Sequence, residues 1–191
     1  MERIPKALRQ DSIIEAVFEI RFKSLEPSAA DLLPGMVLPR LRSRFQTLQA
    51  LPLAQVPRAM RQLQPALAYQ PVNALVGANI RLGLGDQVAS LSVIRPYPGW
   101  AKFRPQIGEA IEALEKTGII GEIERFSLKY VNVLPLGKDA SDLSILRLKL
   151  ELGAFELRGP GRIIRAEIEH NGSIHVVQVS SQAEVNLTMP G

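Results

Sequence analysis

The chain of 191 residues, with a net charge of +4, is long enough for one domain that buries a hydrophobic core. Its 46% apolar and 22% charged residues are ordinary globular values, which argue against a disordered, collagenous or coiled-coil protein. With no cysteine and only two histidines, the chain excludes disulfides, thiolate zinc sites and three-histidine metal sites. Neither a signal peptide nor an apolar run of about 20 residues is visible, so we expect a cytoplasmic protein without membrane association, cofactor or metal.

The charge is placed unevenly along the chain. No carboxylate side chain occurs from Leu32 to Gly85, and this acid-free stretch contains six arginines: Arg40, Arg42, Arg44, Arg58, Arg61 and Arg81. Guanidinium forks suit phosphates and carboxylates, which makes four of them candidate anion-binding residues: Arg40, Arg44, Arg58 and Arg61. Because the net charge is modest, we favour a solvated helix face, or a subunit contact with an acidic patch such as Glu109, Glu112 and Glu115.

The first segments predict a strand followed by an amphipathic helix. Residues 16–22 alternate, with Phe18, Ile20 and Phe22 on one side, as in a half-buried strand. Residues 27–35 break this pattern. From residue 36 to residue 51, four apolar side chains recur at helical spacing and predict the helix: Leu38, Leu41, Phe45 and Leu48.

A long connection and a hairpin are predicted next. Three prolines within residues 52–65 indicate an irregular connection, with a short helical turn near residues 58–63. Residues 66–72 are a weaker strand candidate, because Pro71 interrupts them. Residues 78–84 and 87–94 both alternate, and the Gly85-Asp86 pair between them suits a two-residue turn with glycine first.

The second predicted helix begins near Pro105, which suits a first helical turn, and ends at Gly118. Its apolar stripe consists of Phe103, Ile107, Ile111 and Leu114. Residues 122–134 then alternate as a long strand with two faces: Ile123, Arg125 and Ser127 on one, and Phe126, Leu128 and Tyr130 on the other.

The last third of the chain predicts further strands. Residues 143–152 alternate leucines with charged residues, which favours a strand. Residues 162–172 and 173–181 predict a hairpin around Asn171-Gly172, because both turn positions can adopt a positive φ. This turn places Ile168 opposite His175. Both histidines then share a hairpin face without a carboxylate, so we interpret them as structural residues rather than metal ligands.

Hairpin-rich strands with two amphipathic helices predict an α+β fold. We expect a large, mostly antiparallel sheet with the two helices packed on one face, and a single domain that comprises residues 1–191.

Three blocks of the sequence resemble a known family. They are Glu15–Phe22 (EAVFEIRF), the turn Tyr97-Pro98-Gly99-Trp100 with Phe103, and Arg125–Asn132 (RFSLKYVN). In this order they resemble an uncharacterised, sporadically distributed bacterial protein family, in which an arginine is more usual at the position of Lys129. The resemblance implies an α+β fold and a bacterial cytoplasmic setting, and it implies no activity. Members of this family tend to be longer, which implies that this chain lacks a C-terminal helical segment.

Three hypotheses for function follow. We favour a non-enzymatic binding or protein-interaction module that forms homo-oligomers, because an apparently large apolar sheet occurs without a catalytic motif. The alternative is nucleic-acid or anionic-ligand binding through the arginine-rich residues 40–61. The third hypothesis is an enzyme that uses polar residues around the sheet: Glu19, Arg21, Lys129, Tyr130 and Asn132.

Overall fold

The computed structural model describes residues 11–134, 151–152, 154–156 and 163–180. The chain divides into two compact units, residues 1–133 and 134–191. The first unit has the strands β1 (Ile13–Ser24), β2 (Thr47–Ala50), β3 (Asn73–Val76), β4 (Ile80–Leu84), β5 (Val88–Ile94) and β6 (Ile120–Asn132). Its helices are α1 (Ala29–Val37), α2 (Arg58–Leu63), α3 (Pro65–Ala68) and α4 (Trp100–Glu115), with short 3-10 helices η1 (Leu38–Leu41) and η2 (Pro52–Gln55).

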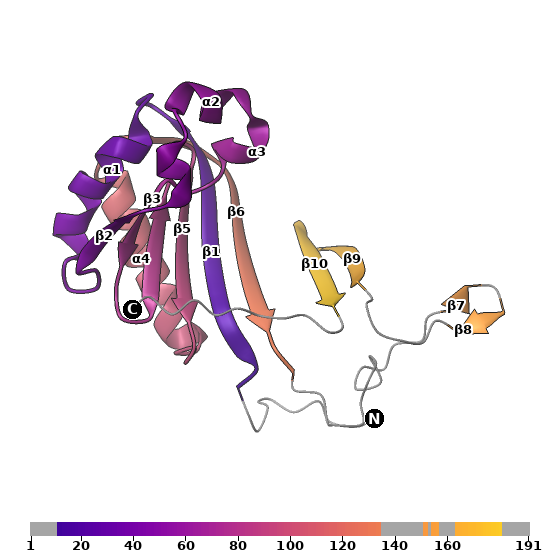
Figure 1. Cartoon of the computed structure of the whole chain (residues 1–191). Helices are drawn as coiled ribbons and strands as arrows, with labels where there is room; N and C mark the ends of the chain where they lie inside the picture. Colours follow the sequence, from indigo (N-terminus) through magenta and orange to yellow (C-terminus); the bar gives the residue numbers. More distant parts are fainter. Residues whose placement is uncertain (1–10, 135–150, 153, 157–162, 181–191) are drawn as a thin grey trace. The chain divides into compact units, whose positions relative to one another are not determined.

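The six strands form one antiparallel sheet in the order β2-β3-β4-β5-β1-β6. The helices α1 and α4 both lie against one face of this sheet (Figure 1). This arrangement confirms the predicted α+β class, with its large antiparallel sheet and two main helices. No helix in the described ranges is long and apolar enough to cross a membrane.

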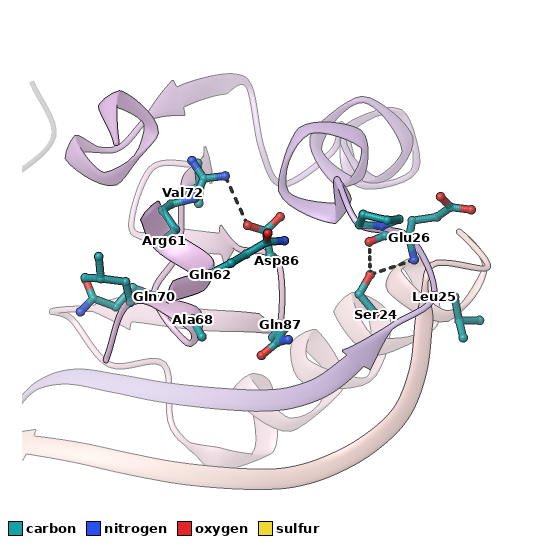
Figure 2. Close-up of a pocket in the computed structure, with 12 residues that line it drawn as sticks. Ser24, Leu25, Glu26, Arg61, Gln62, Ala68, Gln70, Val72, Asp86 and Gln87 are labelled. Carbon is teal, nitrogen blue, oxygen red and sulfur yellow. Dashed lines mark hydrogen bonds and ion pairs between the residues drawn. The ribbon is translucent and has the colours of Figure 1, made fainter. Parts of the chain in front are cut away.

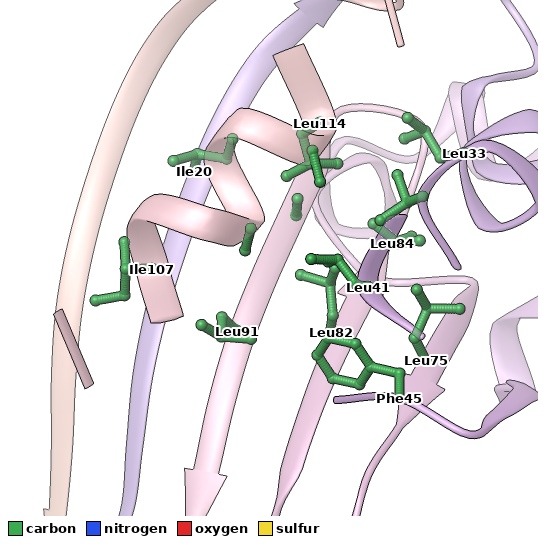
Figure 3. Packing of buried hydrophobic residues seen from close by; sticks show 14 of the residues in the cluster. Ile20, Leu33, Leu41, Phe45, Leu75, Leu82, Leu84, Leu91, Ile107 and Leu114 are labelled. Carbon is green, nitrogen blue, oxygen red and sulfur yellow. The ribbon is translucent and has the colours of Figure 1, made fainter. Parts of the chain in front are cut away.

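The core lies between that sheet face and the two helices (Figure 3). Alternate residues of β1, β4 and β5 point into it and meet the apolar stripes of the helices. Its members include Ala16, Ile20, Leu82 and Leu91 from the sheet, Leu33 and Val37 from α1, and Phe103, Ile107 and Leu114 from α4. Burying a side chain of this size contributes about 1.5–3 kcal/mol, so this layer accounts for most of the unit's stability.

The helix predicted for residues 36–51 is wrong. The helix α1 begins earlier, at Ala29, and Pro39 converts the chain to the short 3-10 helix η1. Proline has no N–H for a helical hydrogen bond, and its ring clashes with the preceding turn, which accounts for the end of the α-helix before residue 39. Leu41 and Phe45 are still buried as predicted, whereas Leu48 lies on strand β2.

A second proline, Pro34, lies inside α1 where the sequence predicts a break. In a regular helix the N–H of residue 34 would donate to the carbonyl of Ala30. Here the Asn73 side chain donates to that carbonyl instead, over 2.9 Å. A side chain from β3 therefore replaces the hydrogen bond that proline cannot make, which allows the helix to extend through this position.

Other boundaries also differ from the prediction. Residues 65–68 form helix α3 where a weak strand was expected, and the strand β3 begins only at Asn73. The helix α4 begins at Trp100, so Pro105 lies in its second turn. The helical turn expected at residues 58–63 is confirmed as α2.

The β4–β5 turn lies one residue later than predicted, and Gly85 packs closely against the backbone of Gln70. Gly85 pairs with Val88 through its N–H, so Asp86 and Gln87 form the turn, and Gly85 lacks the positive φ expected of a first turn residue. A Cβ at position 85 would lie 2.6 Å from the carbonyl oxygen of Gln70. Glycine is needed here for close backbone approach.

The second unit contains two small sheets in its described residues. Strands β7 (Glu151–Leu152) and β8 (Phe155–Glu156) form one, and β9 (Ile163–His170) and β10 (Ser173–Ser180) form the other. The register of β9 and β10 confirms the predicted pairing, with Ile168 opposite His175. Asn171 and Gly172 have φ values of 51° and 72°, as the turn requires. Most of the strand predicted for 143–152 lies outside the described residues.

Candidate functional site

Two arginines of the acid-free stretch form ion pairs with carboxylates that lie outside this stretch. Arg44 donates through Nε and Nη2 to the two carboxylate oxygens of Glu109, over 2.5 and 2.7 Å. This bidentate geometry is the strong form of a charge-assisted hydrogen bond. It raises the pKa of Arg44 and lowers the pKa of Glu109. The acidic helix face thus contacts the arginine segment within one chain.

Arg61 is buried and also has a carboxylate partner (Figure 2). Its Nη2 lies 3.3 Å from Asp86 Oδ2, and its Nη1 donates to the carbonyl of Val56 over 2.8 Å. The other oxygen of Asp86 accepts the N–H of Ala30 at the start of α1. Asp86 therefore connects α1 and α2 to the β4–β5 turn, and Arg61 Nε is buried without a partner in the described residues.

The two remaining candidates for anion binding are exposed. Arg40 donates to the carbonyl of Met36, and Arg58 lies at the start of α2. Neither forms an ion pair with a carboxylate in the described part of the chain. Of the four predicted arginines, two are thus engaged by Glu109 and Asp86, which reduces the positive charge available to a polyanion.

A cavity of about 430 Å³ lies beside Arg61 (Figure 2). The β1–α1 connection, the α2–α3 segment and the β4–β5 turn surround it. Its polar lining residues are Ser24, Glu26, Arg61, Gln62, Gln70, Asp86 and Gln87. Two carboxylates and one guanidinium give this lining a net negative charge, and the three amides can both donate and accept hydrogen bonds.

The polar residues predicted on the sheet are only partly brought together. The β1–β6 register places Glu19 opposite Ser127 and Lys129 opposite Val17, so Glu19, Arg21 and Lys129 share the sheet face without α1 and α4. Arg21 donates to Glu19 over 2.9 Å, and its guanidinium stacks 4.4 Å above the Tyr69 ring.

The other two residues of that hypothesis lie elsewhere. Tyr130 is opposite Ala16, on the helix-covered face, where its hydroxyl contacts that of Tyr97 at 3.3 Å. Burial, with this hydrogen bond, raises the pKa of Tyr97. Asn132 accepts a hydrogen bond from Ser12 at the end of the sheet. These groups do not converge with Glu19 and Arg21 at one point.

The outer strand β6 has an unpaired edge that the sequence did not indicate. It is 13 residues long and last in the strand order, and no other strand of the described residues pairs with its outer edge (Figure 1). The N–H of Val133 donates to Ser12 across the sheet. Since backbone direction alternates along a strand, the N–H and C=O groups of Phe126, Leu128 and Tyr130 point away from β1.

Four apolar side chains of β6 are exposed on the helix-covered face. A bulge between Arg21/Arg125 and Phe22/Ile123 moves Ile123 to this face, whereas simple alternation placed it with Arg125. The exposed fractions are 42% for Ile123, 74% for Phe126, 43% for Leu128 and 37% for Tyr130. We call these four residues the apolar strip. Beyond it, Trp100 is 48% exposed, so Phe103 anchors α4 more than Trp100 does.

Within the described residues, no group of three or more histidine or acidic side chains could hold a metal ion. No protein-family model, curated protein or solved structure matches the chain. The resemblance to a sporadic bacterial family therefore stays a prediction, and the case for function depends on the geometry of β6 and of the cavity.

Proposed function

We propose that this chain is a non-enzymatic protein-interaction module that self-associates by extending its sheet at β6. The observation that carries the proposal is the outer edge of this strand, which pairs with no other strand of the described residues and is bordered by the apolar strip. An added strand would hydrogen-bond the outward groups of Phe126, Leu128 and Tyr130. Its side chains would cover the apolar strip at the same time.

Both parts of this surface favour a partner. Proteins shield edge strands by making them short, charged, bulged or covered. The extra residues of β6 lie at residues 120–125. A third register shift, in which β1 carries the extra residue, lies opposite Val131 and Asn132, and residues 125–131 pair regularly with β1. Apolar side chains that line up along one exposed strand face mark an interaction site more often than isolated ones do. Residues 125–131 of β6 thus provide both a backbone template and an apolar surface.

The contacts of the polar groups proposed for catalysis favour a structural role for these groups. Arg21 is engaged by Glu19 and Tyr69, and Tyr97 by Tyr130. General acid–base chemistry needs titratable groups that converge on one substrate position. On β6, Lys129 and Tyr130 are instead on opposite sheet faces.

Light scattering coupled to size-exclusion chromatography tests the proposal across a wide dilution series of the full chain. We expect a mass of two chains or a multiple, which falls to that of one chain on dilution. A single-chain mass at every concentration would contradict self-association.

We propose small-ligand binding in the Arg61 cavity as a second function, which narrows the anionic-ligand hypothesis. The specific observation is that the buried guanidinium of Arg61 lines a cavity together with three amides and two carboxylates. A concave site with a few polar groups that donate and accept hydrogen bonds is the usual form of a small-molecule site. Because Glu26 and Asp86 also line the cavity, the fitting ligand has donor groups besides a carboxylate, as a free amino acid does.

Thermal unfolding with a panel of free amino acids and with inorganic phosphate tests this second function. We expect stabilisation by at least one amino acid and none by phosphate. The increase should be lost in Gln70→Ala, which alters the lining, and kept in Arg58→Ala, which lies outside it. If no member of the panel raises the melting temperature, the ligand proposal fails.

A further inference from the structure

We infer that the partner at β6 is a second copy of this chain, paired antiparallel about a two-fold axis that passes at Leu128. The inference rests on the proposed self-association and adds its geometry: two six-stranded sheets become one continuous sheet, with both helix layers on the same side. Its premises are the outward backbone groups of β6, its charges and its apolar strip.

Backbone direction limits the possible registers. The outward N–H and C=O groups belong to even-numbered residues between 126 and 132, because the odd-numbered ones bond to β1. In a symmetric antiparallel pair, a residue that precedes the axis by a given number of positions lies opposite the residue of the other copy that follows the axis by the same number. Axes at residues 126 to 130 all place outward groups opposite outward groups. An axis at Lys129 would place this lysine opposite its own copy, and an axis at Tyr130 would place Leu128 opposite the partner's Asn132 at the end of the strand. The side chains also distinguish among the other three.

An axis at Ser127 would place Arg125 opposite the partner's Lys129 twice. Like charges directly opposite each other destabilise a strand pair, and both cations lie on the face without helices. An axis at Phe126 would place Leu128 opposite Glu124, at the bulge. This pairing sets a carboxylate against a leucine and runs the ladder through irregular backbone.

An axis at Leu128 avoids both conflicts. Leu128 lies opposite the partner's Leu128, and Phe126 opposite the partner's Tyr130. Aromatic and aliphatic cross-strand pairs of this kind contribute about 0.2–1 kcal/mol each. On the other face, Arg125 meets the partner's Val131 and Ser127 meets the partner's Lys129. Phe126, Leu128 and Tyr130 of the apolar strip are therefore complementary to their own copies in this register, which is why a second copy fits them.

Cysteine cross-linking tests the axis, because the chain contains no cysteine of its own. Opposite residues in a hydrogen-bonded antiparallel pair have Cα atoms about 5.5 Å apart, within disulfide range. Leu128→Cys should thus form a disulfide-linked dimer under mild oxidation. The matched control is Leu48→Cys on β2, a leucine of similar exposure (51%) at the opposite edge, which should stay monomeric on a denaturing gel.

Mixed variants test the register itself. Phe126→Cys and Tyr130→Cys should cross-link when mixed, and neither should cross-link alone, since each residue and its own copy are about 13 Å apart along the strand. Hydrogen exchange adds a readout without mutation: the amides of Phe126, Leu128 and Tyr130 should gain protection on association.

The outcomes separate this inference from the proposed function. A dimer by light scattering in which Leu128→Cys does not cross-link overturns the axis and leaves self-association standing. Cross-linking of Leu48→Cys in its place would move the interface to β2. A single-chain mass with protected Phe126, Leu128 and Tyr130 amides would assign the edge to another segment of the same chain, and would overturn both proposals.

Discussion

The two edge strands of the six-stranded sheet, β2 and β6, differ in their length and in the side chains that they expose. Strand β2 has four residues and β6 has 13. Short edge strands offer few unpaired backbone groups, whereas long ones offer a template to another strand. Three of the four β2 side chains are small or polar, while β6 displays the apolar strip.

Two ion pairs of the acid-free stretch lie away from β6, whereas Lys23–Glu122 joins β1 to β6. Arg44–Glu109 joins the segment before β2 to helix α4, and Arg61–Asp86 joins α2 to the β4–β5 turn. Two of the arginines that suggested anion binding therefore hold the helices α4 and α2 to the rest of the unit. The comparison teaches that the charge asymmetry of the sequence marks contacts within the unit, whereas exposed apolar side chains lie on β6.

The largest expected loss of stability concerns the Arg61–Asp86 ion pair. Asp86→Ala removes the carboxylate beside buried Arg61 and the acceptor for the Ala30 N–H. Leaving a buried charge without its partner costs about 3–5 kcal/mol. Urea unfolding should show a loss near the lower end of this range, because the 3.3 Å contact is long.

The isosteric change Asp86→Asn is the control for this variant. It keeps an oxygen that can accept the Ala30 N–H and loses only the charge, so it should cost less than Asp86→Ala. Equal stability of Asp86→Ala and the unchanged chain would show that the ion pair between Asp86 and the buried Arg61 does not stabilise the fold.

The next effect concerns β6. Phe126→Lys places a charge in the apolar strip at a side chain that is 74% exposed in the single chain. We expect the dimer dissociation constant to rise about 100-fold, equivalent to about 2.7 kcal/mol, with an unchanged circular dichroism spectrum. Analytical ultracentrifugation measures the constant.

Leu48→Lys on β2 is the matched control, because it adds the same charge at the other edge. It should leave the dissociation constant unchanged. An equal effect of the two substitutions would mean that net charge, rather than the β6 surface, sets the association.

The sequence predicted the class of the fold and its regular parts. Alternation located β1, β4, β5 and β6, because each strand has one buried face whose period of two survives in the sequence. Asn171-Gly172 located the β9–β10 turn for a local reason, since both residues tolerate positive φ. Such signals need no knowledge of distant contacts.

Features that depend on distant residues could not be predicted. The passage of α1 through Pro34 depends on the Asn73 side chain, which replaces the N–H that Pro34 lacks. The face of Ile123 depends on a bulge opposite Phe22. The exposure of Phe126 depends on strand order, because the same residue in a central strand would be buried. Its sequence pattern is that of an ordinary half-buried strand.

The smallest effect concerns the Arg44–Glu109 pair and depends on pH. Glu109→Gln removes one charge of a pair that is about a third to a half exposed, so at neutral pH we expect a loss of at most about 1 kcal/mol. The fork lowers the pKa of Glu109 in the folded chain below its ordinary 4.5. Its stabilisation is therefore complete above pH 4.5 and is lost as the pH falls through the folded pKa.

Urea unfolding of both proteins between pH 3 and 7 should show curves that differ near neutrality and converge in acid. Glu115→Gln on the same helix controls for the loss of one carboxylate, because Glu115 forms no ion pair with a described residue. A difference that persisted unchanged to the lowest pH would assign the effect of Glu109→Gln to packing. Of the two ion pairs, Arg61–Asp86 would then stabilise the unit through its charges and Arg44–Glu109 would not.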